Sequence, residues 1–320
     1  MTNSPHGELL LLSGTANPEL SERIAREIDM PLAHMDITIF ADGEFDVKIG
    51  ESVRGHDVFL IQPTCYPVND NLVQLFVTLD ALRRASAARI TAVMPFYGYQ
   101  RKEKKTQPRD PISAKLMANI IELAGANRVI AVDLHADAIQ GFFDIPVDAL
   151  TATKILARHV RERHGHNVVV VSPDTGGVVR ARNLARIVDA PIAIIDKRRP
   201  RDDQVEVVNV IGDVTDAKCV IIDDLISTGS TLANAATALR QKGAIGVDVV
   251  ATHGVLTDGA LDRLHAAPID EICITDTIPL RPDQRSFDDH PKLRVLSVAP
   301  LVAEAIVRVH EGRSVSELFR

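Results

Sequence analysis

Short apolar runs alternate with amphipathic helical patterns along the whole chain, and this alternation limits the possible folds most strongly. The runs are rich in β-branched residues and mostly lack the in/out alternation of half-exposed strands, which is typical of strands covered by helices on both faces. Strand–helix–strand units repeated in this way build parallel sheets through right-handed crossovers. We therefore predict an α/β protein with strands at 8–13, 57–62, 89–95, 128–133, 168–172, 192–196, 219–224, 247–253 and 271–275.

Two similar halves follow from the same pattern. The runs 129–134 and 220–225 are both apolar strands that end in acidic residues and lead through a loop into a helix. A chain of 320 residues is also long for a single core. We predict two doubly wound domains related by duplication, 1–148 and 149–320, with segment 299–320 free to pack back on either. Helices are expected at 18–28, 69–87, 113–124, 151–164, 177–188, 230–242 and 258–266.

Composition and charge exclude several classes of protein. Asp and Glu number 43 against 36 Lys and Arg, a formal charge of −7, which argues against a nucleic-acid partner because phosphate backbones require a basic face. The longest uncharged stretch, 225–239, is rich in Ser, Thr and Asn, so we expect no membrane span. Three scattered cysteines support neither a disulfide framework nor a zinc cluster, and no secretory signal is evident. A cytoplasmic protein is expected.

The most specific motif begins at the end of a predicted strand. Asp223 and Asp224 follow an apolar run, and a turn of small residues then opens a helix. Backbone N–H groups of such a turn, together with the positive end of the helix dipole, bind phosphate. The two carboxylates can accept hydrogen bonds from sugar hydroxyls, so the motif suits a phosphorylated ribose. Alternatively, the acids cap a helix and the turn is merely polar. The turn is Ser227-Thr228-Gly229-Ser230-Thr231.

This motif resembles the ribose 5-phosphate loop of the phosphoribosyltransferases and of the ribose-phosphate pyrophosphokinase family. Further segments resemble the pyrophosphokinases and follow in that family's order from about residue 8 to residue 319. They are Phe40-Ala41-Asp42-Gly43-Glu44, 101–116, Asp133-Leu134-His135, 140–143, 172–177 and 196–200. The resemblance implies two phosphoribosyltransferase-like domains with the site between them. It also implies synthesis of 5-phospho-α-D-ribose 1-diphosphate and AMP from ATP and D-ribose 5-phosphate, with Mg²⁺.

The resemblance also implies roles for individual residues. Lys197 and Arg199 would be the transition-state cations, although such a basic run is by itself more often a solvated turn. His135 and Asp174 would contact the metal. Both follow predicted strands, and at neighbouring strand ends an imidazole and a carboxylate could hold a metal or its waters. An isolated histidine would otherwise be only a satisfied polar residue. ATP would be bound by Phe40, Asp42, Glu44, Arg101, Lys102 and His135.

The family's adenine-binding hairpin reaches into a neighbouring subunit, so the resemblance also implies a homo-oligomer, of the hexamer-of-dimers type. Read alone, Asp42-Gly43 is a hairpin turn. The segment 98–111, bracketed by Gly and Pro, is a candidate lid over ATP. A regulatory anion pocket would take Arg54, Ser314, Ser316 and Phe319, although an ordinary helix terminus explains the last three equally well.

Two departures from the family pattern are visible. Arg101-Lys102-Glu103 stands where the family usually has Arg-Gln-Asp, and Ser227 and Ser230 stand where many members have Asp and Gly. Two rival functions remain. A phosphoribosyltransferase would explain the phosphate turn without the first domain and would not use ATP. A silent regulatory relative of the pyrophosphokinases would be expected to lose the predicted cations and metal contacts, which are present here.

Overall fold

The computed structural model describes residues 6–198, 207–284 and 290–318. The chain divides into two compact units. The first contains Met1–Thr151, Thr277–Pro279 and Ser297–Arg320, and the second contains Ala152–Asp276 and Leu280–Leu296. The C-terminal segment, whose partner the sequence left open, is therefore part of the first unit. Among the described residues, no helix is both long and apolar enough to cross a bilayer.

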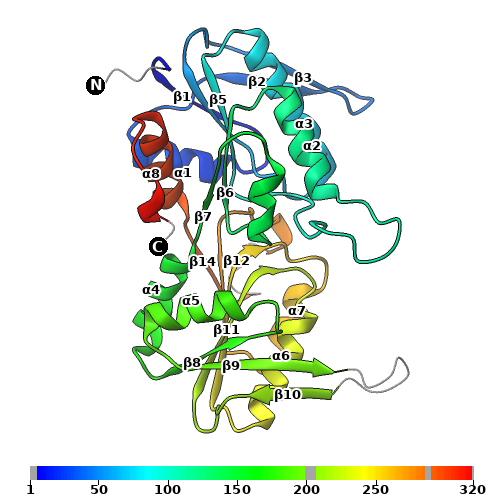
Figure 1. Ribbon diagram of the computed structural model, residues 1–320, viewed down its shortest axis with the longest axis vertical. Helices are drawn as coiled ribbons and strands as arrows, with labels where there is room; N and C mark the ends of the chain where they lie inside the picture. Colours follow the sequence, from blue (N-terminus) through cyan, green and yellow to red (C-terminus); the bar gives the residue numbers. More distant parts are fainter. Residues whose placement is uncertain (1–5, 199–206, 285–289, 319–320) are drawn as a thin grey trace. The chain divides into compact units, whose positions relative to one another are not determined.

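The first unit is built on a five-stranded parallel sheet in the order β1-β4-β5-β6-β7. Helices α2 and α3 cover one face of this sheet, and α1 and α8 pack together on the other (Figure 1). The strands are β1 (Leu9–Ser13), β4 (Asp57–Ile61), β5 (Arg89–Met94), β6 (Arg128–Val132) and β7 (Val147–Leu150). The helices are α1 (Pro18–Ile28), α2 (Val68–Arg84), α3 (Ser113–Ala124) and α8 (Ala299–His310), with 3-10 turns η1 (Asp137–Phe142) and η3 (Ser316–Leu318).

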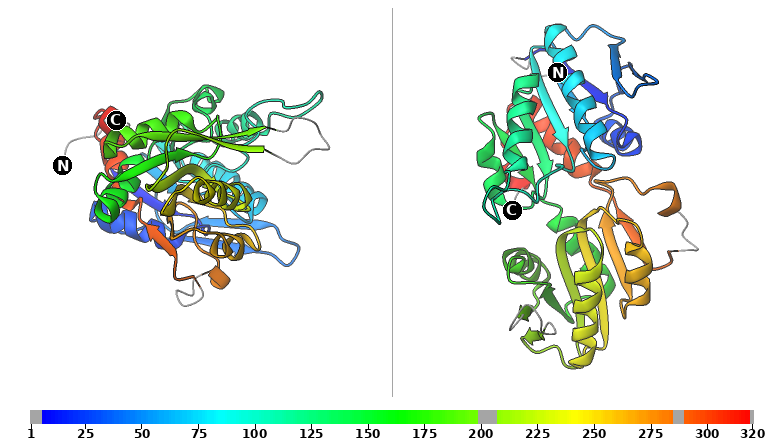
Figure 2. Two further views of the ribbon diagram at one scale, coloured as in Figure 1. Left: turned by 90° about the horizontal axis from the view of Figure 1, so that it is seen from below. Right: turned by 90° about the vertical axis from the view of Figure 1, so that its right-hand side faces the viewer.

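The second unit is built on a seven-stranded sheet in the order β10-β9-β8-β11-β12-β13-β14, with only β10 antiparallel to its neighbour. Helices α4 and α5 lie on one face and α6 and α7 on the other (Figure 2). The strands are β8 (Val168–Ser172), β9 (Ile192–Arg198), β10 (Val207–Ile211), β11 (Lys218–Ile226), β12 (Gly246–Gly254), β13 (Glu271–Thr275) and β14 (Leu293–Leu296). The helices are α4 (Thr153–His164), α5 (Val178–Val188), α6 (Ser230–Gln241) and α7 (Ala260–Ala266), with a 3-10 turn η2 (Pro282–Gln284).

Burial on both faces explains why the strands read as continuous apolar runs. In β11, Val220 and Ile222 pack with Leu156 and Leu184 of α4 and α5. Their neighbour Ile221 packs with the α6 and α7 side chains on the opposite face. Consecutive positions in the middle of such a strand, 219–222 in β11, are therefore all apolar, and the doubly wound α/β class predicted from this pattern is confirmed.

The five strands that sequence reasoning did not predict are short or lie at sheet edges. β2 (Met35–Ile39) and β3 (Phe45–Ile49) form a separate antiparallel hairpin that projects from the first unit (Figure 1). β7, β10 and β14 have four or five residues each and close the edges of the two large sheets. In addition, β9 continues to Arg198, since Lys197 pairs with Val208 of β10. The predicted strand 192–196 left Lys197 beyond its end, and that boundary was wrong.

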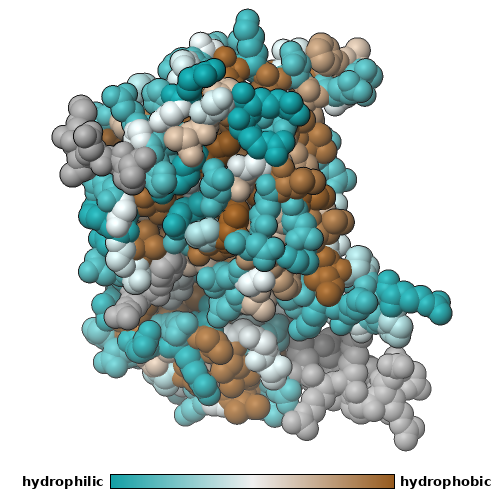
Figure 3. All heavy atoms as spheres, turned by 45° about the horizontal axis from the view of Figure 1, so that its top comes forward, coloured by the Kyte–Doolittle hydropathy of each residue, from teal (hydrophilic) through white to brown (hydrophobic). Residues whose placement is uncertain are grey.

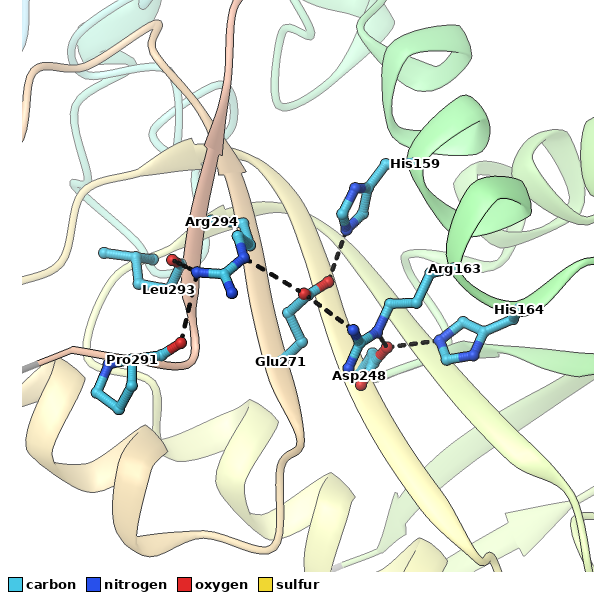
Figure 4. Close-up of polar contacts among 8 residues, drawn as sticks. All are labelled: His159, Arg163, His164, Asp248, Glu271, Pro291, Leu293 and Arg294. Atoms are coloured by element: carbon cyan, nitrogen blue, oxygen red, sulfur yellow. Dashed lines mark hydrogen bonds and ion pairs between the residues drawn. The ribbon is translucent and has the colours of Figure 1, made fainter. Parts of the chain in front are cut away.

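Charged side chains fasten α4 to the start of β12 and β13 (Figure 4). The buried carboxylate of Asp248 accepts a hydrogen bond from Arg163 Nε at 2.6 Å, and His164 Nε2 lies 2.6 Å from the same oxygen. Glu271, also buried, lies 2.6 Å from His159 Nε2 and 3.2 Å from Arg163 Nη1. Since each buried carboxylate has a cationic partner, the network avoids leaving an unpaired charge in the core.

We expect Asp248→Ala to lower the free energy of unfolding by about 3–5 kcal/mol, because Arg163 and His164 would lose the carboxylate that they share. Asp80→Ala is the matched control, since Asp80, whose side chain is 36% exposed, also binds two cations, Arg83 and Arg84. Solvent screens these two ion pairs, so we expect little change. Urea unfolding of both variants measures the difference, and equal effects would contradict it.

Candidate active site

The strand order of the second unit has a topological switch point between β8 and β11. The chain leaves β8 through α5 towards β9 and leaves β11 through α6 towards β12, so the two connections run in opposite directions across the sheet. Ligands of open α/β sheets bind at such switch points, beyond the carboxyl ends of the strands. The loop that carries Asp174 leaves β8 here, and the predicted phosphate turn leaves β11.

A buried acidic pair lies near the end of β11. The side chain of Asp223 is 21% exposed and that of Asp224 is 4% exposed. Arg180, in the first turn of α5, places Nη1 3.2 Å from Asp223 Oδ1 and Nη2 3.4 Å from Asp224 Oδ1. Asp223 Oδ1 also accepts the N–H of Asp224 at 2.9 Å. Sequence reasoning missed Arg180, although a basic residue at the start of the helix after β8 was a visible signal.

The acidic pair does not ionise independently. Burial, together with the hydrogen bond and charge of Asp224, raises the pKa of Asp223 to about 8, and the positive charge of Arg180 acts in the opposite direction. Two carboxyl groups this close share protons and titrate as one unit. Near neutral pH the pair therefore offers both acceptor oxygens and a proton, a combination that suits neighbouring sugar hydroxyls.

The predicted phosphate cradle is the turn 227–231, which leaves β11 and leads into α6. Gly229 adopts φ +75° and directly precedes α6. Thr228 Oγ1 accepts the N–H of Ser230 at 3.4 Å, and Arg263 Nη1 donates to the carbonyl of Thr228. Thr257 holds the other end of the turn by donating its N–H to Ser227 at 3.1 Å. Because Thr228, Ser230 and Thr231 are exposed, the first-turn N–H groups of α6 are accessible to an anion.

Two of the predicted site residues follow strands in different sheets. Asp174 follows β8 of the second sheet, is exposed, and accepts the N–H of Gly177 at 2.9 Å. His135 follows β6 of the first sheet, and its backbone N–H donates to Gln100 Oε1 at 2.9 Å. The two residues are therefore not on neighbouring strands of one sheet, and their joint contact with a metal stays a prediction. In the described part of the chain, no group of three or more His, Cys, Asp or Glu side chains is arranged to hold a metal.

The predicted nucleotide residues of the first unit lie on its surface. Phe40 is 50% exposed at the tip of the β2–β3 hairpin, with Asp42 and Glu44 exposed beside it. Arg101 is exposed. Lys102 is half-buried, and its Nζ lies 3.4 Å from Asp110 Oδ2.

Asp110 organises the candidate lid. Besides Lys102, its carboxylate accepts hydrogen bonds from Thr106 Oγ1 at 2.8 Å and from the N–H of Gln107 at 3.1 Å. The hydrogen bond from Thr106 is the main cause that lowers the pKa of Asp110. The ammonium of Lys102, a departure from the family pattern, is therefore paired within the lid itself.

The remaining predicted site residues are Lys197, Arg199, Arg54, Ser314, Ser316 and Phe319. Lys197 lies in β9 next to the edge strand β10, while Arg199 and Phe319 fall outside the described residues. Arg54, Ser314 and Ser316 are exposed. Ser314 Oγ accepts the N–H of Ser316 at 3.2 Å, and within the described ranges no hydrogen bond or ion pair joins either serine to Arg54. The proposed regulatory pocket stays a prediction.

Comparison with known proteins gives a consistent result over nearly the whole chain. Residues 9–125 match the model of the N-terminal domain of ribose phosphate pyrophosphokinase, and residues 180–320 match that of the phosphoribosyl synthetase-associated domain. Ribose-phosphate pyrophosphokinases from Caldanaerobacter subterraneus and Maricaulis maris are each 53% identical to this chain. Each alignment covers 97% of this chain, and the two alignments cover 98% and 99% of the respective relative.

A solved structure agrees with these relatives. The phosphoribosylpyrophosphate synthetase from Mycobacterium smegmatis superposes with a TM-score of 0.89 at 44% sequence identity. The match covers 95% of this chain and 99% of that one, so both units have counterparts there.

Proposed function

Because the chain belongs to the ribose-phosphate pyrophosphokinase family, we propose that it transfers the diphosphoryl group of ATP to the C1 hydroxyl of D-ribose 5-phosphate. The products are 5-phospho-α-D-ribose 1-diphosphate and AMP. The observation that carries the proposal is the acidic pair beside a phosphate cradle at the switch point of the second sheet. Such a site binds the sugar phosphate at both ends and leaves its anomeric carbon to face the nucleotide.

The residues of the second unit would position the sugar for attack. Asp223 and Asp224 accept hydrogen bonds from the ribose hydroxyls, and the turn 227–231 holds the 5-phosphate. The anomeric oxygen attacks the β-phosphorus of ATP, the bond from that phosphorus to the oxygen of AMP breaks, and AMP leaves. Lys197 and Arg199 would stabilise the charge that spreads over the transferring group. Orientation alone can contribute about 7–11 kcal/mol, so no covalent intermediate is needed.

The chain also offers ligands suited to Mg²⁺. Asp174 is an exposed carboxylate with one oxygen on the N–H of Gly177, which fixes its orientation and leaves further acceptor capacity. Mg²⁺ prefers a few carboxylate oxygens together with waters and substrate phosphates. His135 would act beside it, directly or through a water. Bound there, the metal would neutralise polyphosphate charge.

The enzyme assay separates this function from its rivals. Purified protein with ATP and ribose 5-phosphate is expected to form AMP, and to do so only when Mg²⁺ is present. A phosphoribosyltransferase would instead consume 5-phospho-α-D-ribose 1-diphosphate with a base and leave ATP intact, and a silent regulatory relative would do neither. Unchanged ATP in the full assay would refute the proposal.

A second copy of this chain is the proposed partner, as a homohexamer. Ile39 and Phe40 expose 63% and 50% of their surface at the hairpin tip, where the aromatic ring can reach a nucleotide in another subunit. Exposed Val73, Leu116 and Leu123 add an apolar face over α2 and α3 (Figure 3). A monomer that kept full activity at high dilution would contradict the shared site.

The three buried, free cysteines also suit a reducing compartment, so we propose the cytoplasm.

Binding of ribose 5-phosphate is expected to release protons at pH 7. Hydroxyl donors favour the ionised carboxylates, so binding should lower the pKa of Asp223 from its raised value of about 8. Calorimetry in buffers of different ionisation enthalpy measures the release, and Asp223→Asn should reduce it. A release unchanged in that variant would show that the proton comes from elsewhere.

The same raised pKa sets a pH dependence for the ligand-free protein. The folded state keeps a proton on Asp223 that the unfolded chain loses above about pH 4. The contribution of this retained proton to the free energy of unfolding is therefore complete below about pH 4, and it is lost as the pH rises from there towards 8. Asp223→Asn should flatten this part of the stability profile.

A further inference from the structure

Gln100 joins two loops of the first unit that carry predicted nucleotide residues. It follows β5, its side chain is 1% exposed, and its Oε1 accepts the N–H of His135 at 2.9 Å, although the two residues lie 35 positions apart. β5 and β6 are adjacent parallel strands, so the loops that follow them lie at the same edge of the sheet. The hydrogen bond therefore links the segment leading to Arg101 with the loop that presents His135.

The loop that carries His135 needs such a support. Asp133, directly after β6, adopts φ +40°, a left-handed conformation that costs a non-glycine residue about 1–2 kcal/mol. Strained backbone of this kind persists only where its surroundings hold it on both sides. The N–H of Asp133 donates to the carbonyl of Leu150 at 2.8 Å, and the bond from His135 to Gln100 holds the other side.

Gln100 also determines how Arg101 is presented. The N–H of Lys102 donates to the carbonyl of Tyr99 at 3.0 Å, which closes a turn with Gln100 and Arg101 at its two central positions. The first of these side chains is buried and the second is exposed. Holding Gln100 inside the unit therefore keeps the guanidinium of Arg101 outside it.

Stability alone does not explain a glutamine at this position. The buried Gln100 Nε2 has no hydrogen-bond partner in the described part of the unit, and leaving a buried donor unpaired is unfavourable. Gln62 provides the contrast. It is also 1% exposed, but its Oε1 accepts the N–H of Ala16 at 3.1 Å and its Nε2 donates to Gln74 at 2.8 Å.

We propose that Gln100 is a positioning residue for the nucleotide, because its side-chain oxygen fixes the backbone of His135 relative to Arg101. This inference rests on the proposed function, in which both residues contact ATP. Gln100 itself is buried and touches no substrate. Its contribution is to hold the imidazole of His135 and the guanidinium of Arg101 in fixed positions relative to each other. This lowers the entropic cost of ordering them when the nucleotide binds.

Three variants test this role. Gln100→Met keeps the length of the side chain but removes the acceptor, Gln100→Glu restores an acceptor oxygen, and Gln62→Met removes a fully paired buried amide from the same unit. Calorimetry with a non-hydrolysable ATP analogue, with and without Mg²⁺, reports nucleotide binding separately from turnover. Melting temperature and the KM values for both substrates complete the comparison.

We expect Gln100→Met to weaken analogue binding and to lower kcat/KM for ATP by about 10- to 100-fold. The KM for ribose 5-phosphate and the melting temperature should stay near wild type. Gln100→Glu should recover most of the loss. Gln62→Met should lower the melting temperature and leave analogue binding unchanged.

The inference is overturned if Gln100→Met binds the analogue as tightly as wild type, or if Gln100→Glu is as defective as Gln100→Met. A melting temperature lowered as far as in Gln62→Met would also overturn it, because the role would then be structural. If wild-type protein forms no AMP from ATP and ribose 5-phosphate, the proposed function fails instead, and the binding comparison still reports on Gln100.

Discussion

Replacing Lys197 with alanine is expected to lower kcat by at least about 100-fold while the protein stays folded. The transfer of a diphosphoryl group spreads negative charge over oxygens that the protein can stabilise only with cations. Lys197 lies in β9, where its backbone pairs with Val208, so alanine preserves the ladder and removes only the charge. Initial rates of AMP formation at saturating ATP and ribose 5-phosphate measure the effect.

Lys218→Ala is the matched control for this charge. Lys218 begins β11 and is exposed, whereas the acidic pair and the phosphate cradle lie near the other end of that strand. We expect near-normal turnover from this variant. If Lys197→Ala also turned over normally, its assigned role would be wrong, and equal losses in both variants would point to a general effect of net charge.

Replacing Gly229 with alanine is expected to raise the KM for ribose 5-phosphate by about 10- to 100-fold. Gly229 adopts φ +75°, which an L-residue tolerates poorly. A Cβ there would also lie 2.9 Å from Leu264 Cγ and 3.3 Å from the carbonyl oxygen of Ala260. The turn must therefore shift, and its N–H groups would no longer converge on the phosphate.

Gly259→Ala separates the backbone strain from the collision. Gly259 adopts φ +73° and also directly precedes a helix, α7, but a Cβ added to it meets nothing within 4 Å. Both variants bear a similar conformational cost, and only Gly229→Ala should lose affinity for the sugar phosphate. Equal binding of ribose 5-phosphate by the two variants, measured by calorimetry, would rule out the cradle.

Local sequence signals were sufficient to predict the bounds of an element where the residues at its own ends determine where it begins and stops. Helices α1 and α3 have the bounds predicted for them. Asn17 accepts the N–H of Leu20 and Pro18 opens α1, so the beginning of that helix depends only on neighbouring residues. The predicted phosphate turn is similar, since Gly229 directly precedes α6 and Ser230 and Thr231 begin that helix.

Pairing with distant residues decided the elements that the sequence did not reveal. Strands β7 and β14 have only four residues each, and these two and β10 pair at the edges of existing sheets, which supply their hydrogen-bond partners. The extension of β9 through Lys197 depends in the same way on β10. Pairing of this kind joins strands that are far apart in the chain, so it leaves no pattern in the local sequence of either strand.

Residue type and order by themselves predicted an α/β chain of two largely parallel sheets, and a turn of small residues behind paired acids that suits a phosphate. Only the tertiary structure decided that Arg180 meets both acids and that Gln100 supports His135. The physical reason is that periodicity and capping act over a few residues, whereas these contacts depend on which strands become neighbours.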